Sequence, residues 1–218
     1  MTVEMSATAG PQASTSATAT TASSILANAP GTSKDRIIVG SKAIVCQDAD
    51  LRGEISIGSG CVLHPRCTIF AYAGPIILGD YCIVEENAVI VNRSKEPMTI
   101  GSYNLFEVGC RIEAQSIGSY NTFEPKSRVS SSLSIGDYCT IGAACIATAD
   151  QTASAEDWAA LDELGSKHLP DYTVVYGAAN ERRKWSGEGK VQQIALMHKH
   201  LAYLSETLPK YARLKLFT

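Results

Sequence analysis

Apolar residues recur at every sixth position through most of the chain. The recurrence begins at Val39 and continues, with a few breaks, to Ile141. An α-helix repeats apolar residues about every 3.6 positions and a half-buried strand every second position, so neither explains a period of six. Hexads are typical of a parallel β-helix, in which three short strands make one triangular turn of about 18 residues. The residues that anchor the hexads are Val39, Val45, Leu51, Ile57, Leu63, Ile69, Leu78, Val84, Ile90, Ile100, Phe106, Ile112, Ile117, Phe123, Val129, Ile135 and Ile141.

The breaks in this repeat fall at regular places. Extra residues follow Ile69 and Ile90, one residue is missing after Ile112, and a long interruption follows the weak last anchor, Ala147. Each break comes after a multiple of three hexads, so the three faces stay in register and the loops leave from a single edge. The sequence therefore predicts an all-β solenoid, a parallel β-helix of about seven turns, over residues 35–180.

The fifth place of the hexads holds small residues, and six of the seven cysteines occupy it. Alternate side chains of a strand share a face, so the fifth place should point inward beside the next anchor. A reduced cysteine packs as a small hydrophobe, and the cysteine spacings fit neither zinc pairs nor a disulfide scaffold. We interpret these cysteines as core residues. Asn104 and Asn121 share the fifth place one turn apart, which predicts two stacked side-chain amides that hydrogen-bond along the ladder.

Two segments depart from the repeat. Residues 1–34 are rich in Ala, Ser and Thr and cannot bury enough apolar surface to offset the entropy of ordering, which predicts a disordered tail. They lack the apolar stretch of a secretory signal and the arginines of a transit peptide, so we expect a reducing compartment, the cytosol or the nucleus. Residues 149–168 interrupt the ladder, and a capping pattern at Ser154 with a stop at Gly165 predicts a short helical insertion there.

An amphipathic helix is predicted after the ladder, over residues 188–208, and should end before Pro209. Its apolar residues, spaced three and four positions apart, need a surface to lie on. The outward sixth place on one face of the β-helix offers an apolar column of Ile44, Val62, Ile83, Leu105, Thr122 and Thr140. We expect either this helix or a second subunit to cover the column, and the sequence does not choose between them.

Charge and hydropathy argue against two classes of partner. The net charge is −3, and the single cluster of adjacent basic residues is Arg182, Arg183 and Lys184. A nucleic-acid binder needs a basic surface that displaces counterions from phosphates. No run of residues approaches the ~18 consecutive apolar positions that a membrane span needs. We expect neither nucleic acid nor a membrane span.

Candidate chemistry rests on four histidines. Hexapeptide β-helices include acyltransferases, which use a histidine base, and gamma-class carbonic anhydrases, whose zinc is held by three histidines. Here His64 alone lies in the ladder, whereas His168, His198 and His200 lie in the late loop and the terminal helix, so three imidazoles cannot converge on one zinc ion. We therefore predict no catalytic residue, no metal site and no cofactor, with a hexapeptide acyltransferase or a gamma-carbonic-anhydrase-like enzyme as the alternative.

Six segments between residues 35 and 208 carry a resemblance to a known family. They read Asp50-Leu-Arg-Gly-Glu-Ile-Ser-Ile-Gly, Leu63-His-Pro-Arg-Cys, Ala73-Gly-Pro-Ile, Val84-Glu-Glu-Asn-Ala, Ile100-Gly-Ser-Tyr-Asn-Leu-Phe-Glu-Val-Gly-Cys and Val175-Tyr-Gly-Ala. They resemble the dynactin subunit 6 family of hexapeptide-repeat proteins.

The resemblance implies a left-handed coil, which periodicity alone does not give. It also implies a non-catalytic assembly subunit of the dynactin pointed-end complex, which supports dynein-driven microtubule transport through protein–protein contacts. The implied partners are dynactin subunit 5, as a heterodimer, and other pointed-end subunits, including an actin-related protein. The implied location is cytoplasmic and cytoskeleton-associated.

Overall fold

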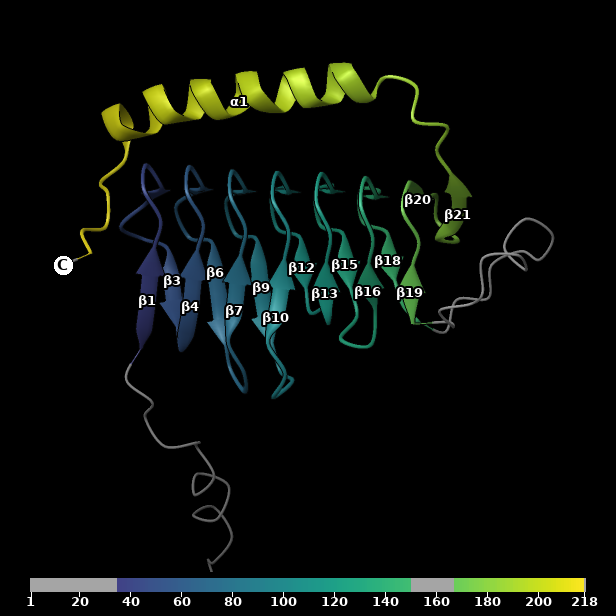
Figure 1. Ribbon diagram of the computed structural model, residues 1–218, viewed down its shortest axis with the longest axis horizontal. Helices are drawn as coiled ribbons and strands as arrows, with labels where there is room; N and C mark the ends of the chain where they lie inside the picture. Colours follow the sequence, from purple (N-terminus) through teal and green to yellow (C-terminus); the bar gives the residue numbers. More distant parts are fainter. Residues whose placement is uncertain (1–34, 150–166, 218) are drawn as a thin grey trace, which may run out of the picture. The chain divides into compact units, whose positions relative to one another are not determined.

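The computed structural model describes residues 35–149 and 167–217. These residues coil into a parallel β-helix, and one long helix, α1 (Lys190–Tyr211), runs along its length (Figure 1). The predicted tail at residues 1–34 lies outside the described residues, and so does nearly all of the predicted insertion, residues 150–166.

Each complete turn contributes one strand to each of three sheets. The first sheet contains β1 (Arg36–Val39), β4 (Glu54–Ile57), β7 (Ile76–Leu78), β10 (Met98–Ile100), β13 (Ser116–Ile117), β16 (Ser134–Ile135) and β19 (His168–Leu169). The second contains β2 (Ile44–Val45), β5 (Val62–Leu63), β8 (Ile83–Val84), β11 (Leu105–Phe106), β14 (Thr122–Phe123), β17 (Thr140–Ile141), β20 (Thr173–Tyr176) and β21 (Glu181–Lys184). The third contains β3 (Asp50–Arg52), β6 (Thr68–Ala71), β9 (Val89–Asn92), β12 (Arg111–Ile112), β15 (Arg128–Val129) and β18 (Ile146–Ala147).

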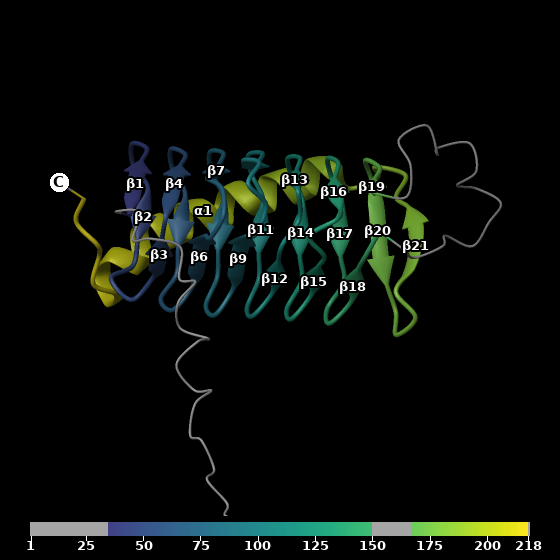
Figure 2. The ribbon, with the colours of Figure 1, turned by 90° about the horizontal axis from the view of Figure 1, so that it is seen from below.

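The solenoid has six complete turns and a partial seventh formed by β19 and β20, where the sequence predicted about seven. Figure 2 shows the turns side by side, with α1 behind them. The extra residues after Ile69 and Ile90, and the described ends of the interruption after Ala147, all lie between a strand of the third sheet and the next strand of the first. Length variation is therefore confined to one edge of the triangle.

Strand pairing joins each anchor to the anchor one turn away. Val45 pairs with Leu63, and Phe106 pairs with Phe123, whose ring stacks on it with centroids 4.9 Å apart. Sixteen of the seventeen predicted anchors are buried, and Val39, in the first turn, is partly buried and packs against the core. The core is thus a column of stacked side chains that runs the length of the solenoid.

The fifth place also points inward, and several of its side chains satisfy backbone carbonyls of the next turn. The thiols of Cys61 and Cys82 donate to the carbonyl oxygens of Gly79 and Gly101 at 3.0 and 3.2 Å. All seven cysteines are buried and free of disulfides. This placement makes all seven core residues, and Cys61, Cys82, Cys139 and Cys145 also hydrogen-bond to the backbone.

The two stacked asparagines hydrogen-bond along the ladder as predicted, but their side-chain amides bond to backbone groups of the next turn and not amide to amide. Asn104 Nδ2 donates to the carbonyl oxygens of Gly101 and Gly118 at 2.8 Å, and Asn104 Oδ1 accepts the Asn121 backbone N–H at 2.9 Å. Backbone groups at the corner are close enough to use the amide, and a buried backbone group without a partner is costly.

Helix α1 extends past its predicted end. It was expected over residues 188–208, but it begins at Lys190 and continues through Pro209 to Tyr211. A proline lacks only its own N–H, and the Ala212 N–H still donates to the Leu208 carbonyl at 2.8 Å, which bridges the last turn. Among the described residues, no helix is long and apolar enough to cross a membrane.

The close approach of the backbones of neighbouring turns can be tested by substituting a glycine at the contact. A Cβ atom on Gly79 would lie 2.7 Å from the Gly101 backbone, so Gly79→Ala should destabilise the fold by about 1–3 kcal/mol. Gly109 has a positive φ of 69°, which Asn tolerates, and a Cβ there would meet only Lys126 Cγ at 3.8 Å, so Gly109→Asn is the matched control and should stay within about 0.5 kcal/mol of wild type. Urea unfolding measures both, and equal losses would contradict the close stacking.

The burial of the cysteine thiols leads to a second testable prediction, on their reactivity. Burial raises the pKa of Cys67, Cys110 and Cys139 to about 12, so about one thiol in ten thousand is ionised at about pH 8. A disulfide reagent should label these three cysteines in the folded protein at least about a hundredfold more slowly than in denaturant. Mass spectrometry of the labelled peptides measures the rates, and rapid labelling of the folded chain would show that these thiols are accessible.

Candidate interaction surfaces

Helix α1 covers the apolar column on the second sheet. Val62 and Ile83 form a buried cluster with Leu201 and Leu204 of the helix. Leu105 packs against this cluster, and Gln193 Nε2 lies 3.5 Å from Thr122 Oγ1, within hydrogen-bonding distance. Ile44 and Thr140, at the two ends of the column, are half-buried. Of the two occupants considered from the sequence, the structure places the chain's own terminal helix on this face.

A ladder of stacked tyrosines lines one corner beside the helix, and sequence reasoning missed it. The tyrosines occupy the fourth place of the first hexad in successive turns, each with a positive φ: Tyr81, Tyr103, Tyr120, Tyr138 and Tyr172. Neighbouring ring centroids lie 4.9–5.2 Å apart. The repeated Tyr at that place was the available signal, since stacked turns superimpose equivalent residues.

Two helix residues attach α1 to this ladder. His198 stacks on Tyr103 with centroids 5.3 Å apart. Lys190 Nζ lies 3.8 Å from the centre of the Tyr138 ring and donates a hydrogen bond to Tyr172 Oη at 3.0 Å. Hydrogen bonds to Tyr172 and Tyr138 raise the pKa of Lys190. The helix is therefore held by aromatic and cation–π contacts as well as by apolar packing.

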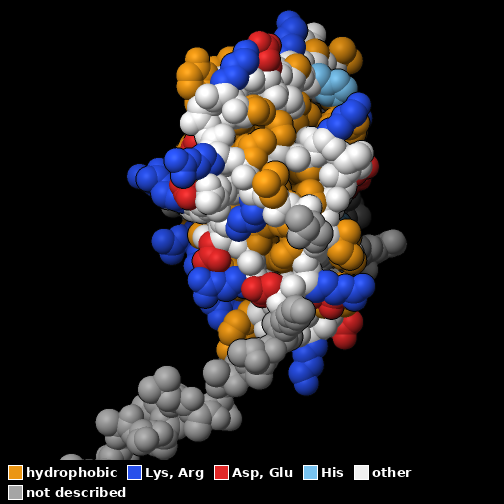
Figure 3. All heavy atoms as spheres, turned by 90° about the vertical axis from the view of Figure 1, so that its left-hand side faces the viewer, with side chains coloured by type: hydrophobic (Ala, Val, Ile, Leu, Met, Phe, Trp, Pro, Cys, Tyr) orange, Lys and Arg blue, Asp and Glu red, His pale blue; other side chains and the backbone are white. Residues whose placement is uncertain are grey.

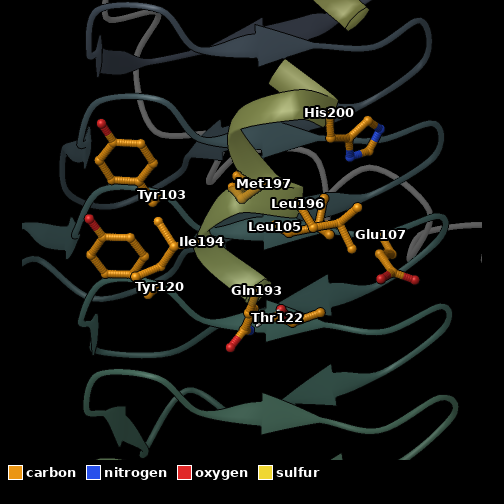
Figure 4. A pocket seen from close by; sticks show the side chains of 10 residues that line it. All are labelled: Tyr103, Leu105, Glu107, Tyr120, Thr122, Gln193, Ile194, Leu196, Met197 and His200. Atoms are coloured by element: carbon orange, nitrogen blue, oxygen red, sulfur yellow. Dashed lines mark hydrogen bonds between the residues drawn. The ribbon is translucent and has the colours of Figure 1, made fainter. Parts of the chain in front are cut away.

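A pocket of about 200 Å³ remains between the helix and the second sheet (Figure 4). Tyr103 and Tyr120 lie on one side of it, and Glu107, Leu196 and His200 lie on the other. Its full lining is Tyr103, Leu105, Glu107, Tyr120, Thr122, Gln193, Ile194, Leu196, Met197 and His200. The lining is mainly apolar, with a carboxylate and an imidazole at one side.

The four histidines lie on separate elements. His64 is buried in the ladder, and its Nδ1 lies 2.9 Å from Glu86 Oε1. Burial alone would raise the pKa of Glu86, but the hydrogen bond from His64 and the positive charge of Arg66 outweigh it, so the pKa of Glu86 is lowered. His168 lies in β19, whereas His198 and His200 lie on α1. Within residues 35–149 and 167–217, no three His, Cys, Asp or Glu side chains are grouped so as to hold a metal ion.

The outer face of the first sheet carries a full-length row of residues without Lys, Arg, Asp or Glu, and the Arg36–Glu54 ion pair lies beside that row at one end. Strand register aligns its outward residues into one row: Ile38, Ser56, Ile77, Thr99, Ser116, Ser134 and His168. Seven strands spaced ~4.8 Å apart make this row roughly 30 Å long. Ile38 and Ile77 are 52% and 44% exposed. Apolar residues this exposed in a row without Lys, Arg, Asp or Glu are characteristic of a contact surface.

The outer face of the third sheet is different because its outward row contains charged residues. Strand register places Asp50, Arg111 and Arg128 in that row. Arg111 Nη2 lies 2.6 Å from Glu113 Oε1, and Arg52 Nη2 lies 2.8 Å from Asp50 Oδ2. Of the three faces, the second is covered by α1, the third has charged residues in its outward row, and the first has no Lys, Arg, Asp or Glu in its row.

The ends of the sheets differ as well. The second sheet is extended at one end by the antiparallel strand β21 and at the other by residues 213–215, where the Lys215 N–H donates to the Val45 carbonyl at 2.8 Å. Among the described residues, no strand pairs with the outer edge of β1. Figure 3 views this end and shows apolar side chains in its centre with charged ones around them.

Comparison with solved structures shows that this fold occurs in other proteins. A crystal structure of a hexapeptide transferase family protein from Anaplasma phagocytophilum matches with a TM-score of 0.55 and 13% identity, over 80% of this chain and 92% of that one. At this identity the likeness shows the fold alone. The protein is a hexapeptide-repeat protein, and the predicted left-handed parallel β-helix is confirmed.

Sequence relatives narrow this class to one family, although no family model matches the chain. Dynactin subunit 6 of Nematostella vectensis is 35% identical over 191 residues, 83% of this chain and 92% of the relative. Dynactin subunit 6 of Danio rerio is 32% identical over 200 residues, 86% of this chain and 92% of the relative. The chain belongs to the dynactin subunit 6 family, which confirms the resemblance seen in the sequence.

The docking of α1 can be tested by substitution. Leu204 is 6% exposed, so Leu204→Ala should lower the free energy of unfolding by about 2–4 kcal/mol and weaken amide protection in α1. Leu196 is 69% exposed, so Leu196→Ala should change it by less than about 0.5 kcal/mol. Urea unfolding with hydrogen exchange measures both, and equal effects would mean that α1 does not lie on this face in solution.

Proposed function

We propose that this chain is a non-catalytic assembly subunit of dynactin that acts through protein–protein contacts. Its membership of the dynactin subunit 6 family is the observation that carries this proposal. The distribution of surface chemistry supports it, because one long face is rigid and carries a full-length row without Lys, Arg, Asp or Glu.

Rigidity suits such a role. Each strand of the first sheet between β1 and β19 is paired on both sides with the strands of the adjacent turns, so the outer row is held in place before a partner arrives. A preorganised surface loses little conformational entropy on binding. The short Ser and Thr side chains let another flat surface approach closely, while Ile38 and Ile77 supply apolar area.

The partner that best fits a β-helix face with such an uncharged row is another β-helix of similar shape. We therefore propose dynactin subunit 5, a related hexapeptide-repeat protein, as the heterodimer partner on the first sheet. In this proposal the pair joins other pointed-end subunits, including an actin-related protein, in a cytoplasmic, cytoskeleton-associated complex that supports dynein-driven transport along microtubules.

The placement of the histidines argues against the enzymatic alternative. A carbonic-anhydrase-like site needs three imidazoles on one metal ion, and here His64, His168 and the pair on α1 occupy different elements. A histidine-dependent acyltransferase needs an accessible imidazole base, whereas His64 is buried against Glu86.

Substitutions on two faces test the proposed contact. Ile77→Arg introduces a charge into the first-sheet row, and burying it without a partner in an interface should reduce association about tenfold or more. Thr68→Lys places a charge on the third sheet and is the control. Both variants would be co-expressed with dynactin subunit 5 and the pair quantified by size-exclusion chromatography. Retention of the heterodimer by Ile77→Arg, or equal loss in both variants, would contradict this face as the contact.

A further inference from the structure

The polar side of the pocket beneath α1 contains a carboxylate with no partner in the described structure. Glu85, Glu107 and Glu124 occupy the same place in three successive turns. Glu85 Oε2 accepts the Val108 N–H of the next turn at 3.1 Å, and Glu124 Oε2 accepts the Ala143 N–H of the next turn at 2.8 Å. Two of the three carboxylates are thus committed to backbone donors.

Glu107 has no such backbone donor, because of the residue that faces it in the next turn. By the same register its donor would be the backbone of residue 125, which is a proline and has no N–H. Within the described residues, no hydrogen bond or ion pair joins the Glu107 carboxylate to another side chain or to the backbone. Glu107 therefore lines the pocket with both carboxylate oxygens available.

The surroundings of Glu107 favour a positively charged ligand. Burial raises the pKa of Glu107, and the neighbouring Glu85 and Glu124 carboxylates raise it further. A cation would relieve this repulsion and replace lost hydration. The rest of the lining is mainly apolar, with Leu105, Ile194 and Met197 in it, and its polar side chains include Thr122, Gln193 and His200.

We propose that this pocket binds the side chain of an arginine from a partner protein, with its hydrocarbon stem against the apolar lining and its guanidinium on Glu107. Arginine combines these two properties, since its stem packs on apolar surface while its planar head binds a carboxylate in a bidentate manner. Leu196 and Val108 beside the pocket are 69% and 41% exposed, and they provide apolar surface for the partner residues that flank the arginine. The proposal that the ligand belongs to a partner protein depends on the assembly role proposed above.

A fragment titration tests the pocket independently of any complex. The probe is n-butylguanidinium, added to the purified full chain and followed by methyl NMR of Leu105 and Met197. We expect saturable shifts for wild type and about tenfold weaker binding for Glu107→Gln. The matched control Glu124→Gln should bind as wild type does, because that carboxylate already holds the Ala143 N–H.

A second variant keeps the charge of the Glu107 carboxylate but gives it a backbone hydrogen-bond donor. Pro125→Ala keeps Glu107 but supplies the missing N–H, so it should also weaken the probe. The neutral isostere n-butylurea should bind much more weakly than n-butylguanidinium. Absence of saturable shifts, equal binding by Glu107→Gln and wild type, unchanged binding by Pro125→Ala, or equal binding of n-butylurea would each overturn the proposed site.

Incorporation into dynactin tests the protein ligand. Tagged wild type, Glu107→Gln and Glu124→Gln would be expressed in cells, and the sedimenting complex quantified by its identified subunits. We expect less incorporation of Glu107→Gln alone. If Glu107→Gln is incorporated to the same level as wild type, although the wild-type pocket binds the fragment, then an arginine from a dynactin subunit is not the occupant. Failure of wild type to incorporate would instead contradict the assembly role itself.

Discussion

The structure depends on the stacking of each turn on the next in strict register. Anchor pairs with anchor from Val45 to Val175, and a slip by one residue would turn every inward side chain outward. The same constraint explains the glycines at the first corner, where a Cβ would meet the backbone of the next turn, and the confinement of longer loops to one edge. Each turn can vary only where its neighbours do not touch it.

Stacking also decides how the three faces differ. Because equivalent positions superimpose, a residue type that recurs once per turn becomes a continuous surface. Recurring apolar residues on the second sheet form the surface on which α1 lies, recurring tyrosines make the ladder that His198 and Lys190 contact, and recurring short side chains make the uncharged row of the first sheet. The differences between the faces are therefore a consequence of the repeat, and the proposed partner contacts use the first sheet and the pocket between α1 and the second sheet.

Much of this could be predicted from the sequence because a period of six, with breaks at multiples of three, leaves few alternatives. The inward cysteines and the apolar column followed from the same count. The sequence did not choose between α1 and a second subunit on that column, since both would bury the same residues. It also missed contacts set by backbone geometry, such as Asn104 on the Gly118 carbonyl, and the continuation of α1 through Pro209. The availability of Glu107 was visible only once its register with Pro125 was known.

The most direct test of the account is a cryo-electron microscopy map of dynactin assembled with this chain. The stacked turns and the position of α1 leave the first sheet as the uncovered face whose outward row, among the described residues, has no Lys, Arg, Asp or Glu. The account predicts density of a neighbouring subunit against the row that contains Ile77 and Thr99, with α1 still lying on the second sheet. A map in which that row faces solvent while the charged third sheet carries the contact would contradict it.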